Sequence, residues 1–512
     1  MMLGKKLLLY PLLCFTIVLA LNIPRLPAKP GVASPQLDGQ DFRISAMGPD
    51  GNTRFFALDP AVAYNGSANE YLVVWAANDE GAALADDEFE IYGQRIDAAT
   101  GAALDPRFHI SSVGTDADSA YDPAVAYNSV NDEYLVVWQE DNGVNDEIEI
   151  YGQRLDASGD EIGSDDFRLS NMGPDGDPAF DALNPALAYN ATQNEYLVVW
   201  HGDDELDNVV EIYGQRLNAA SGDEVGLDDF VISDMGASGA DGRFRGQDVA
   251  AVYNSSDDEY LVVWEGDDDT LPLVNDELEI FGQRLAADGS PVGENDFRIS
   301  DMGPDKSPAY AADNPAVAYN SVANAYLVVW SGDDNHDFGD GPLADGEIEV
   351  FGQRLAADGS PVGDNDFRIS DMGPDGNPAF KTFGAEALYI APLDEYLVVW
   401  RGDDDGDFGP LVDDEMEIFG QWLDGATGAA LEEDFRISDA GNNDGDPAFD
   451  ADRVAIAAHI SNRVGIVLAV WQGDDEIGTL APDEIEILGR QFSNPREVEL
   501  SYVYLPLVRN ND

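Results

Sequence analysis

A segment that ends in tryptophan recurs seven times along the 512-residue chain, and this repeat constrains the fold more than any other feature of the sequence. Each copy is an apolar run of the type EYLVVW, as at residues 133–138. The aligned tryptophans are spaced 62 to 71 residues apart and are Trp75, Trp138, Trp200, Trp264, Trp330, Trp400 and Trp471. Such self-similarity indicates a repeat architecture. A large aromatic residue at one fixed place in every repeat is interpreted as packing between neighbouring repeats.

Each repeat contains four short segments with the composition of β-strands. They are exemplified by residues 123–128 (PAVAYN), 133–138 (EYLVVW), 149–155 (EIYGQRL) and 296–300 (DFRIS), here called strands a to d. Val, Ile, Tyr, Phe and Trp dominate these segments, and Gly, Asp, Asn and Pro separate them. No stretch has helical periodicity. The sequence therefore predicts an all-β fold, a single seven-bladed β-propeller with four antiparallel strands per blade.

The order of segments at the chain ends predicts that the ring closes. A DFRIS segment at residues 41–45 precedes the first repeat, whereas the last repeat ends with strand c at residues 484–492. The N-terminal strand is therefore expected to complete the last blade. An open solenoid does not need this permutation and carries polar caps, which are not seen here. A β-helix or two stacked sandwiches remain the alternatives.

The charged residues restrict the partners of the chain. Asp and Glu number 101 against 26 Lys and Arg, which gives a formal charge of -75. Nucleic acid is excluded as a partner because phosphate binding needs clustered cations. An anionic membrane surface is disfavoured for the same reason.

The first residues of the chain predict export. Lys5 and Lys6 precede an apolar run at residues 7–21, the pattern of a signal peptide, with an uncleaved anchor as the alternative. The only cysteine, Cys14, lies in that run, so the mature chain is expected to form no disulfide. We divide the chain into a signal peptide and linker (residues 1–33), the propeller (34–493) and a C-terminal tail (494–512). The predicted protein is secreted or at the cell surface, monomeric, and has no transmembrane domain once mature.

The loops between strands b and c are rich in carboxylates. Most open with the letters GDD, and they share one face of the predicted disc with the loops that follow strand d. Hard divalent cations prefer carboxylate and carbonyl oxygens. Calcium is therefore predicted to bind Asp203, Asp204, Asp267, Asp268, Asp333, Asp334, Asp403, Asp404, Asp474 and Asp475. None of these loops matches an EF-hand, and acidic loops that serve solubility or adaptation to high salt are the competing interpretation.

The repeat sequences diverge toward the C-terminal end of the chain. The GQR motif of strand c becomes Gln421-Trp422 in the sixth repeat, and the fifth and sixth repeats have the longest b–c loops. A specific ligand is therefore predicted to contact His336, Phe338, Phe408 and Trp422. Sequence drift beside the ring closure is the alternative explanation.

Three glycosylation sequons begin at Asn65, Asn190 and Asn254. All three lie in the link between strands a and b, where Asn is a favoured turn residue. We interpret them as turns.

The repeat AYN…EYLVVW…GQRL…FRIS, over about residues 41–493, resembles repeats of secreted bacterial propeller-like proteins whose function is largely unassigned. The resemblance carries no catalytic assignment. Residues 504–509 (YLPLVR) resemble short YLPLV tails at the ends of exported bacterial proteins, which implies surface sorting or attachment. An extra edge strand over residues 498–508 is the alternative.

The sequence contains no recognisable active site. The four histidines, His109, His201, His336 and His459, occupy four different positions of the repeat and form no catalytic pattern. The chain is therefore expected to be a non-enzymatic extracellular binding or scaffold propeller, stabilised by calcium, with a protein or carbohydrate ligand. A carbohydrate-active hydrolase or lyase with a carboxylate site on the acidic face is the alternative.

Overall fold

A computed structural model describes residues 39–497 with gaps. The gaps are residues 79–87, 113–118, 142–146, 175, 204–209, 236–244, 268–272, 274–275, 305, 335–342, 344–345, 375, 404–415, 440–449, 462–463 and 475–483. The predicted signal peptide and nearly all of the predicted tail lie outside the described residues. No helix in the described ranges is long and apolar enough to cross a membrane.

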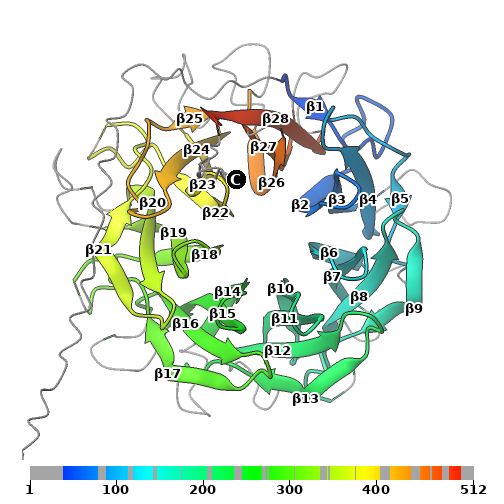
Figure 1. Cartoon of the computed structure of the whole chain (residues 1–512), viewed down its shortest axis with the longest axis horizontal. Helices are drawn as coiled ribbons and strands as arrows, with labels where there is room; N and C mark the ends of the chain where they lie inside the picture. Colours follow the sequence, from blue (N-terminus) through cyan, green and yellow to red (C-terminus); the bar gives the residue numbers. More distant parts are fainter. Residues whose placement is uncertain are drawn as a thin grey trace, which may run out of the picture. The chain divides into compact units, whose positions relative to one another are not determined.

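The described residues form seven four-stranded antiparallel sheets that follow one another around a ring (Figure 1). Blade one has β2 (Ala57–Asn65), β3 (Glu70–Ala77), β4 (Glu90–Asp97) and β5 (Phe108–His109). Blade two has β6 (Ser119–Asn128), β7 (Glu133–Asp141), β8 (Ile148–Asp156) and β9 (Glu161–Arg168). Blade three has β10 (Ala182–Asn190), β11 (Glu195–Gly202), β12 (Glu211–Asn218) and β13 (Glu224–Val231). Blade four has β14 (Arg245–Asn254), β15 (Glu259–Asp267), β16 (Glu279–Ala286) and β17 (Pro291–Arg298).

Blade five has β18 (Ala312–Asn320), β19 (Ala325–Asp333), β20 (Ile348–Ala356) and β21 (Pro361–Arg368). Blade six has β22 (Thr382–Ile390), β23 (Glu395–Gly402), β24 (Glu417–Asp424) and β25 (Phe435–Arg436). Blade seven has β26 (Ala451–Ser461), β27 (Val464–Gly473), β28 (Glu486–Glu497) and the N-terminal strand β1 (Phe42–Arg43). The predicted seven-bladed propeller is confirmed.

Ring closure follows the predicted arrangement. The N-terminal strand β1 pairs antiparallel with β28, with Phe42 opposite Gly489 and Arg43 opposite Leu488. The Arg43 guanidinium also contacts the Glu486 carboxylate on β28. The first described residues thus supply the outer strand of the last blade.

The outermost strand of a blade differs from the predicted DFRIS segment. In blade four it spans Pro291–Arg298 rather than residues 296–300, because a tight turn sends the chain straight back along β16. Ile299 leaves the sheet and packs in the core. The acidic residues that follow strand c, such as those of residues 160–166, therefore lie largely on an edge strand, where exposed charges discourage pairing with another chain.

The hydrophobic core lies between neighbouring blades. The cluster around Trp138, for example, combines Leu72 and Val74 of blade one with Tyr134 and Val136 of blade two. All seven repeated tryptophans are at most 1% exposed. The tryptophans therefore pack between blades, as the sequence predicts.

Candidate functional site

The inner strands of all seven blades surround one central cavity of about 710 Å³. Figure 1 shows β2, β6, β10, β14, β18, β22 and β26 facing the middle of the ring. A cavity of this size falls in the range that small-molecule ligands occupy in proteins. Because every blade contributes to it, the cavity is where differences between repeats meet.

A β-bulge at the same place in every inner strand shapes the cavity wall. The pairing register with the second strand shifts there in all seven blades. One bulge residue per blade has a positive φ of 45° to 58°, and these residues are Asp59, Asp122, Asn184, Asp248, Asn314, Gly384 and Arg453. Asp, Asn and Gly tolerate this backbone region well, which explains six of the seven residues. All seven residues line the cavity.

Arg453 connects acids of two other blades across the ring closure. Its Nη1 atom lies 3.0 Å from Asp59 Oδ1 and 3.1 Å from Asp122 Oδ1. Burial, together with the charge of Asp122, raises the pKa of Asp59 to about 6, although Arg453 opposes this. Further round the wall, Asn184 Nδ2 donates to Asp248 Oδ1 at 3.0 Å. The bulge ring is therefore a polar network rather than seven equivalent side chains.

Glu386 on β22 departs most from the repeat. The other six blades carry alanine at this position, namely Ala61, Ala124, Ala186, Ala250, Ala316 and Ala455. Glu386 lines the cavity, and its side chain is exposed to that cavity. Loss of bulk solvent raises its pKa to about 7. It has no hydrogen-bond or ion-pair partner among the described residues.

Arg401 lies on the same stretch of wall as Glu386 but is engaged elsewhere. Its Nη1 atom forms an ion pair with Asp452 Oδ1 at 2.8 Å, and its guanidinium lies 5.3 Å from the centre of the Phe383 ring. Glu386 is not among the residues expected from the tryptophans, loops and GQR motifs of the sequence. An alignment of the seven inner strands would have revealed it as the one acid among alanines.

The predicted calcium residues lie at the start of the b–c loops. Those within the described ranges are at most 7% exposed: Asp203, Asp267, Asp333, Asp334, Asp403 and Asp474. Three of them accept backbone N–H bonds that hold the loop: Asp267 from Asp276 (2.7 Å), Asp333 from Gly346 (2.6 Å) and Asp474 from Asp450 (2.8 Å). The other predicted ligands, Asp204, Asp268, Asp404 and Asp475, lie outside the described residues. Within the described ranges, no group of three or more Asp, Glu, His or Cys side chains is arranged to hold a metal ion.

A second set of acids clamps the outer strand of each blade. A buried glutamate at the start of strand c accepts the hydroxyl of the serine in FRIS in all seven blades. The glutamates are Glu90, Glu149, Glu211, Glu279, Glu349, Glu417 and Glu486. Each serine oxygen in turn accepts a backbone N–H of strand c at 2.6 to 2.8 Å. Burial raises the pKa of Glu279 and Glu349 to about 7. Part of the acidity of the chain is therefore structural.

The loops after strands b and d share one face, as the sequence predicts. At the end of a b–c loop, Glu147 accepts the N–H of Gly176 in the next d–a loop at 3.0 Å. Glu347 accepts the N–H of Gly376 at 2.8 Å in the same way. These glutamates fasten the MGPDG loops to the blade.

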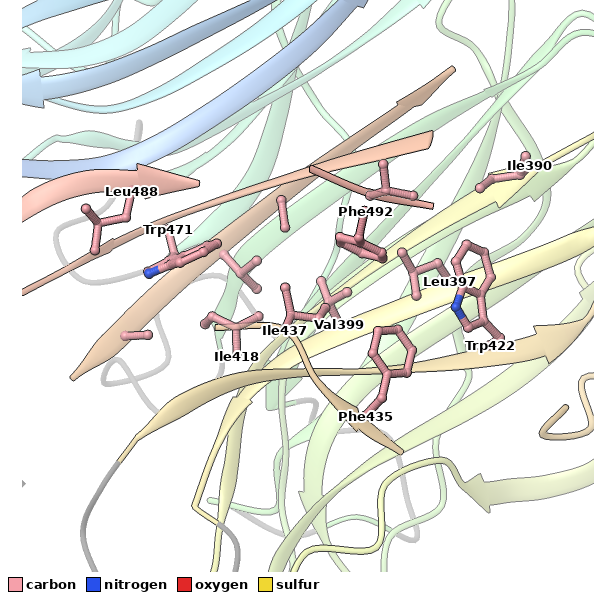
Figure 2. Close-up of a cluster of buried hydrophobic side chains, with 14 residues drawn as sticks. Ile390, Leu397, Val399, Ile418, Trp422, Phe435, Ile437, Trp471, Leu488 and Phe492 are labelled. Carbon is pink, nitrogen blue, oxygen red and sulfur yellow. The ribbon is translucent and has the colours of Figure 1, made fainter. Parts of the chain in front are cut away.

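Trp422 is fully buried between blades six and seven. In blades one to four, the residue at its position is an arginine that pairs with the glutamate of EYLVVW, as Arg154 does with Glu133 at 2.6 Å. Figure 2 shows that Trp422 and Phe435 of blade six belong to one cluster with Phe492 of blade seven. This geometry favours a packing role for Trp422. His336, Phe338 and Phe408, the other predicted ligand contacts, lie outside the described residues.

The three sequon asparagines have no exposed surface. Asn190 Oδ1 accepts the turn N–H groups of Thr192 and Gln193 at 2.9 Å, and its Nδ2 donates to Asp258 of the next blade at 3.0 Å. The interpretation of these motifs as turns agrees with this geometry.

No protein-family model and no curated protein matches the chain. Among solved structures, it is similar to the polysaccharide lyase Uly1 with 10% identity and a TM-score of 0.46, over 86% of this chain and 90% of that one. It is similar to the β-propeller domain of the Trilobed protease from Pyrococcus furiosus with 9% identity and a TM-score of 0.42, over 88% of this chain and 98% of that one. The α-L-arabinofuranosidase Arb93A from Fusarium graminearum has 12% identity and a TM-score of 0.43, over 72% of this chain and 94% of that one. Likeness at these identities concerns the fold alone.

Proposed function

We propose that this chain is an extracellular binding scaffold that holds its ligand in the central cavity and does not turn it over. The observation that carries this proposal is the position of the departures from the repeat. Gly384, Glu386 and Arg453 replace the residues typical of the other blades, and all three line the same cavity. A wall that served only to close the ring would need no such differences. The cavity volume suits a small carbohydrate better than a folded protein.

Calcium is a further part of this proposal. The acidic b–c loops begin with buried carboxylates, and burying negative charge is unfavourable unless a cation or hydrogen bonds compensate it. Backbone N–H groups supply some of this compensation, and calcium bound by the loops as a whole would supply more. Export of the chain would expose these loops to calcium outside the cell.

A binding screen with a cavity-filled variant tests the proposed site. The full chain is screened by calorimetry against oligosaccharides, small organic cations and small organic anions. Ala455→Phe narrows the cavity, and Ala61→Phe is a second variant should the first fail to fold. Val130→Phe adds the same aromatic side chain at an exposed turn and serves as the matched control.

We expect one ligand class to bind with a stoichiometry of one per chain and to be lost in the cavity variants alone. Binding of about seven ligands per ring, or binding that persists in the cavity variants, would place the site elsewhere. Absence of binding across the screen would contradict a binding role for the cavity.

A carbohydrate-active hydrolase or lyase is the second candidate function. It is favoured by one observation, the pKa of about 7 at Glu386, which suits a general acid or base near neutral pH. Incubation with oligosaccharides and analysis of their reducing ends distinguishes the two candidates. Time-dependent cleavage that Glu386→Gln abolishes would establish the enzyme and exclude the pure scaffold.

A further inference from the structure

We infer that Glu386 makes the central cavity a binding site for a small ligand that carries a protonated amine or guanidinium group. This inference rests on the proposed function, because it names the ligand class of the same cavity. It is carried by the cavity itself, by the residue that replaces alanine at position 386, and by the pairing of every other charge on the wall.

The charged residues of the wall are almost all engaged. The cavity is lined by five carboxylates and two guanidinium groups, a formal charge of -3. Arg453 contacts Asp59 and Asp122, and Arg401 contacts Asp452. Both cations of the wall are therefore already bound to acids, and they are not available to an anionic ligand.

The remaining two acids differ in their surroundings. Asp248 accepts the Asn184 amide at 3.0 Å. Glu386 has no partner among the described residues, although its carboxylate faces the cavity. A carboxylate that lines a hollow without a protein partner is free to accept a charge-assisted hydrogen bond from a cationic ligand.

Neighbouring acids strengthen the preference for a cation. Behind the wall, Asp313 and Asp248 contribute to a raised pKa at Glu265 of about 8, for which burial is the largest cause. A hollow whose wall carries a net negative charge concentrates cationic ligands. An anionic ligand would meet repulsion from the wall and find no unpaired cation.

The repeat supplies a variant with a well-founded control. Glu386→Ala introduces the residue that the other six blades carry at this position, so the blade is expected to fold. Asp364→Ala removes one carboxylate from the exposed outer strand β21 and serves as the charge-matched control. Glu386→Gln keeps the shape of the side chain and removes only its charge.

The test is calorimetry of the full chain with four small probes. Agmatine and glucosamine carry the cation on an aliphatic chain and on a sugar, butyrate is anionic and glucose is neutral. We expect agmatine, glucosamine or both to bind one per chain, and Glu386→Ala and Glu386→Gln to weaken binding by about tenfold or more. Asp364→Ala should leave the affinity unchanged. The relative affinity of the two cations tells whether the amine comes from a sugar.

Three results would overturn the inference. One is that neither cation binds the wild-type chain at concentrations up to about 10 mM. Another is that both Glu386 variants bind the cations as well as the wild type, which would indicate adsorption to the acidic surface. The third is that glucose or butyrate binds in the cavity in place of the cations. This third result would leave the proposed binding function standing, whereas a failure of the cavity-filled variants to lose binding would contradict that function.

Discussion

Tyr71 of blade one and His459 of blade seven share a hydrogen bond across the ring closure, with Tyr71 Oη 2.7 Å from His459 Nδ1. His459 occupies the position that asparagine holds in blades one to five. There the asparagine reaches the equivalent tyrosine of the next blade, as Asn254 Nδ2 does in donating to Tyr326 Oη at 2.9 Å. The last blade thus retains the hydrogen bond to the tyrosine of the neighbouring blade, but the partner is a histidine, which titrates, instead of an asparagine.

His459 is predicted to make the ring closure sensitive to acid. Burial lowers its pKa below the usual 6.5, so the folded chain binds fewer protons there than the unfolded chain. Its contribution to stability is therefore present above pH 6.5 and is lost as the pH falls below that value. His459→Asn restores the residue of the repeat and removes this dependence. Melting temperatures of the two proteins should converge near pH 8 and separate toward pH 5 in favour of the variant; a constant difference would contradict the prediction.

The buried glutamates that accept the serine hydroxyls of the outer strands have the opposite effect on the pH dependence of stability. Their pKa is raised in the folded chain, to about 7 for Glu279 and Glu349, so the folded chain binds more protons than the unfolded one. Stability should therefore increase as the pH falls from about 8 through 7, and decrease in alkali. Glu349→Gln, which can still accept the Ser370 hydroxyl, should reduce this slope in thermal melts between pH 6 and 9. A slope equal to that of the wild type would show that this carboxyl does not titrate there.

Removal of residues 39–45 is predicted to destabilise the whole ring and not only its last blade. Without β1, the outer edge of β28 loses its pairing, and Glu486 loses both the Ser45 hydroxyl and the Arg43 guanidinium. Ser45→Ala alone should cost about 1–3 kcal/mol, because it removes one hydrogen bond from the buried Glu486 carboxylate and the side-chain acceptor of the Ile487 N–H. Ser370→Ala removes the same bonds in blade five and is the matched control. An unchanged denaturation midpoint for the deletion would show that the ring does not depend on its closure strand.

The repeat made the propeller and its closure predictable, because each repeat contains four segments with the composition of β-strands and the missing outer strand can be counted. The start of β17 at Pro291 was not predictable in the same way. Pro, Gly, Asp and Asn in residues 291–296 have turn composition, and only pairing with β16 makes them a strand. The position of Glu386 on the cavity wall was not predictable for a related reason. Which residues of an inner strand face the cavity depends on the bulge beside it, and that bulge is a property of the paired sheet.

Trp422 is predicted to be required for stability. It is fully buried in the cluster between blades six and seven (Figure 2). In this cluster the ring centres of Phe435 and Phe492 lie 6.0 Å apart. Trp422→Ala should cost about 3–5 kcal/mol in equilibrium unfolding, as for other large buried aromatics. Trp422→Arg restores the motif of blades one to five but places a guanidinium beside apolar rings, so it should also destabilise. If Trp422→Ala leaves stability unchanged and abolishes ligand binding, the residue serves the ligand rather than the core.

Calcium is predicted to stabilise the propeller through its acidic b–c loops. The described loops begin with buried carboxylates such as Asp267 and Asp333, and the mature chain expected from the sequence has no cysteine with which to tie these loops down. A cation that binds the folded chain alone adds stability by mass action, roughly 2.7 kcal/mol per site at a hundredfold excess over its dissociation constant. Thermal melts in millimolar calcium should therefore give a higher melting temperature than melts with a chelator. Sodium chloride at matched ionic strength separates specific binding from charge screening, because screening would protect equally well. If the chelator has no effect, or if sodium restores stability completely, the loops do not depend on calcium and the acids serve solubility.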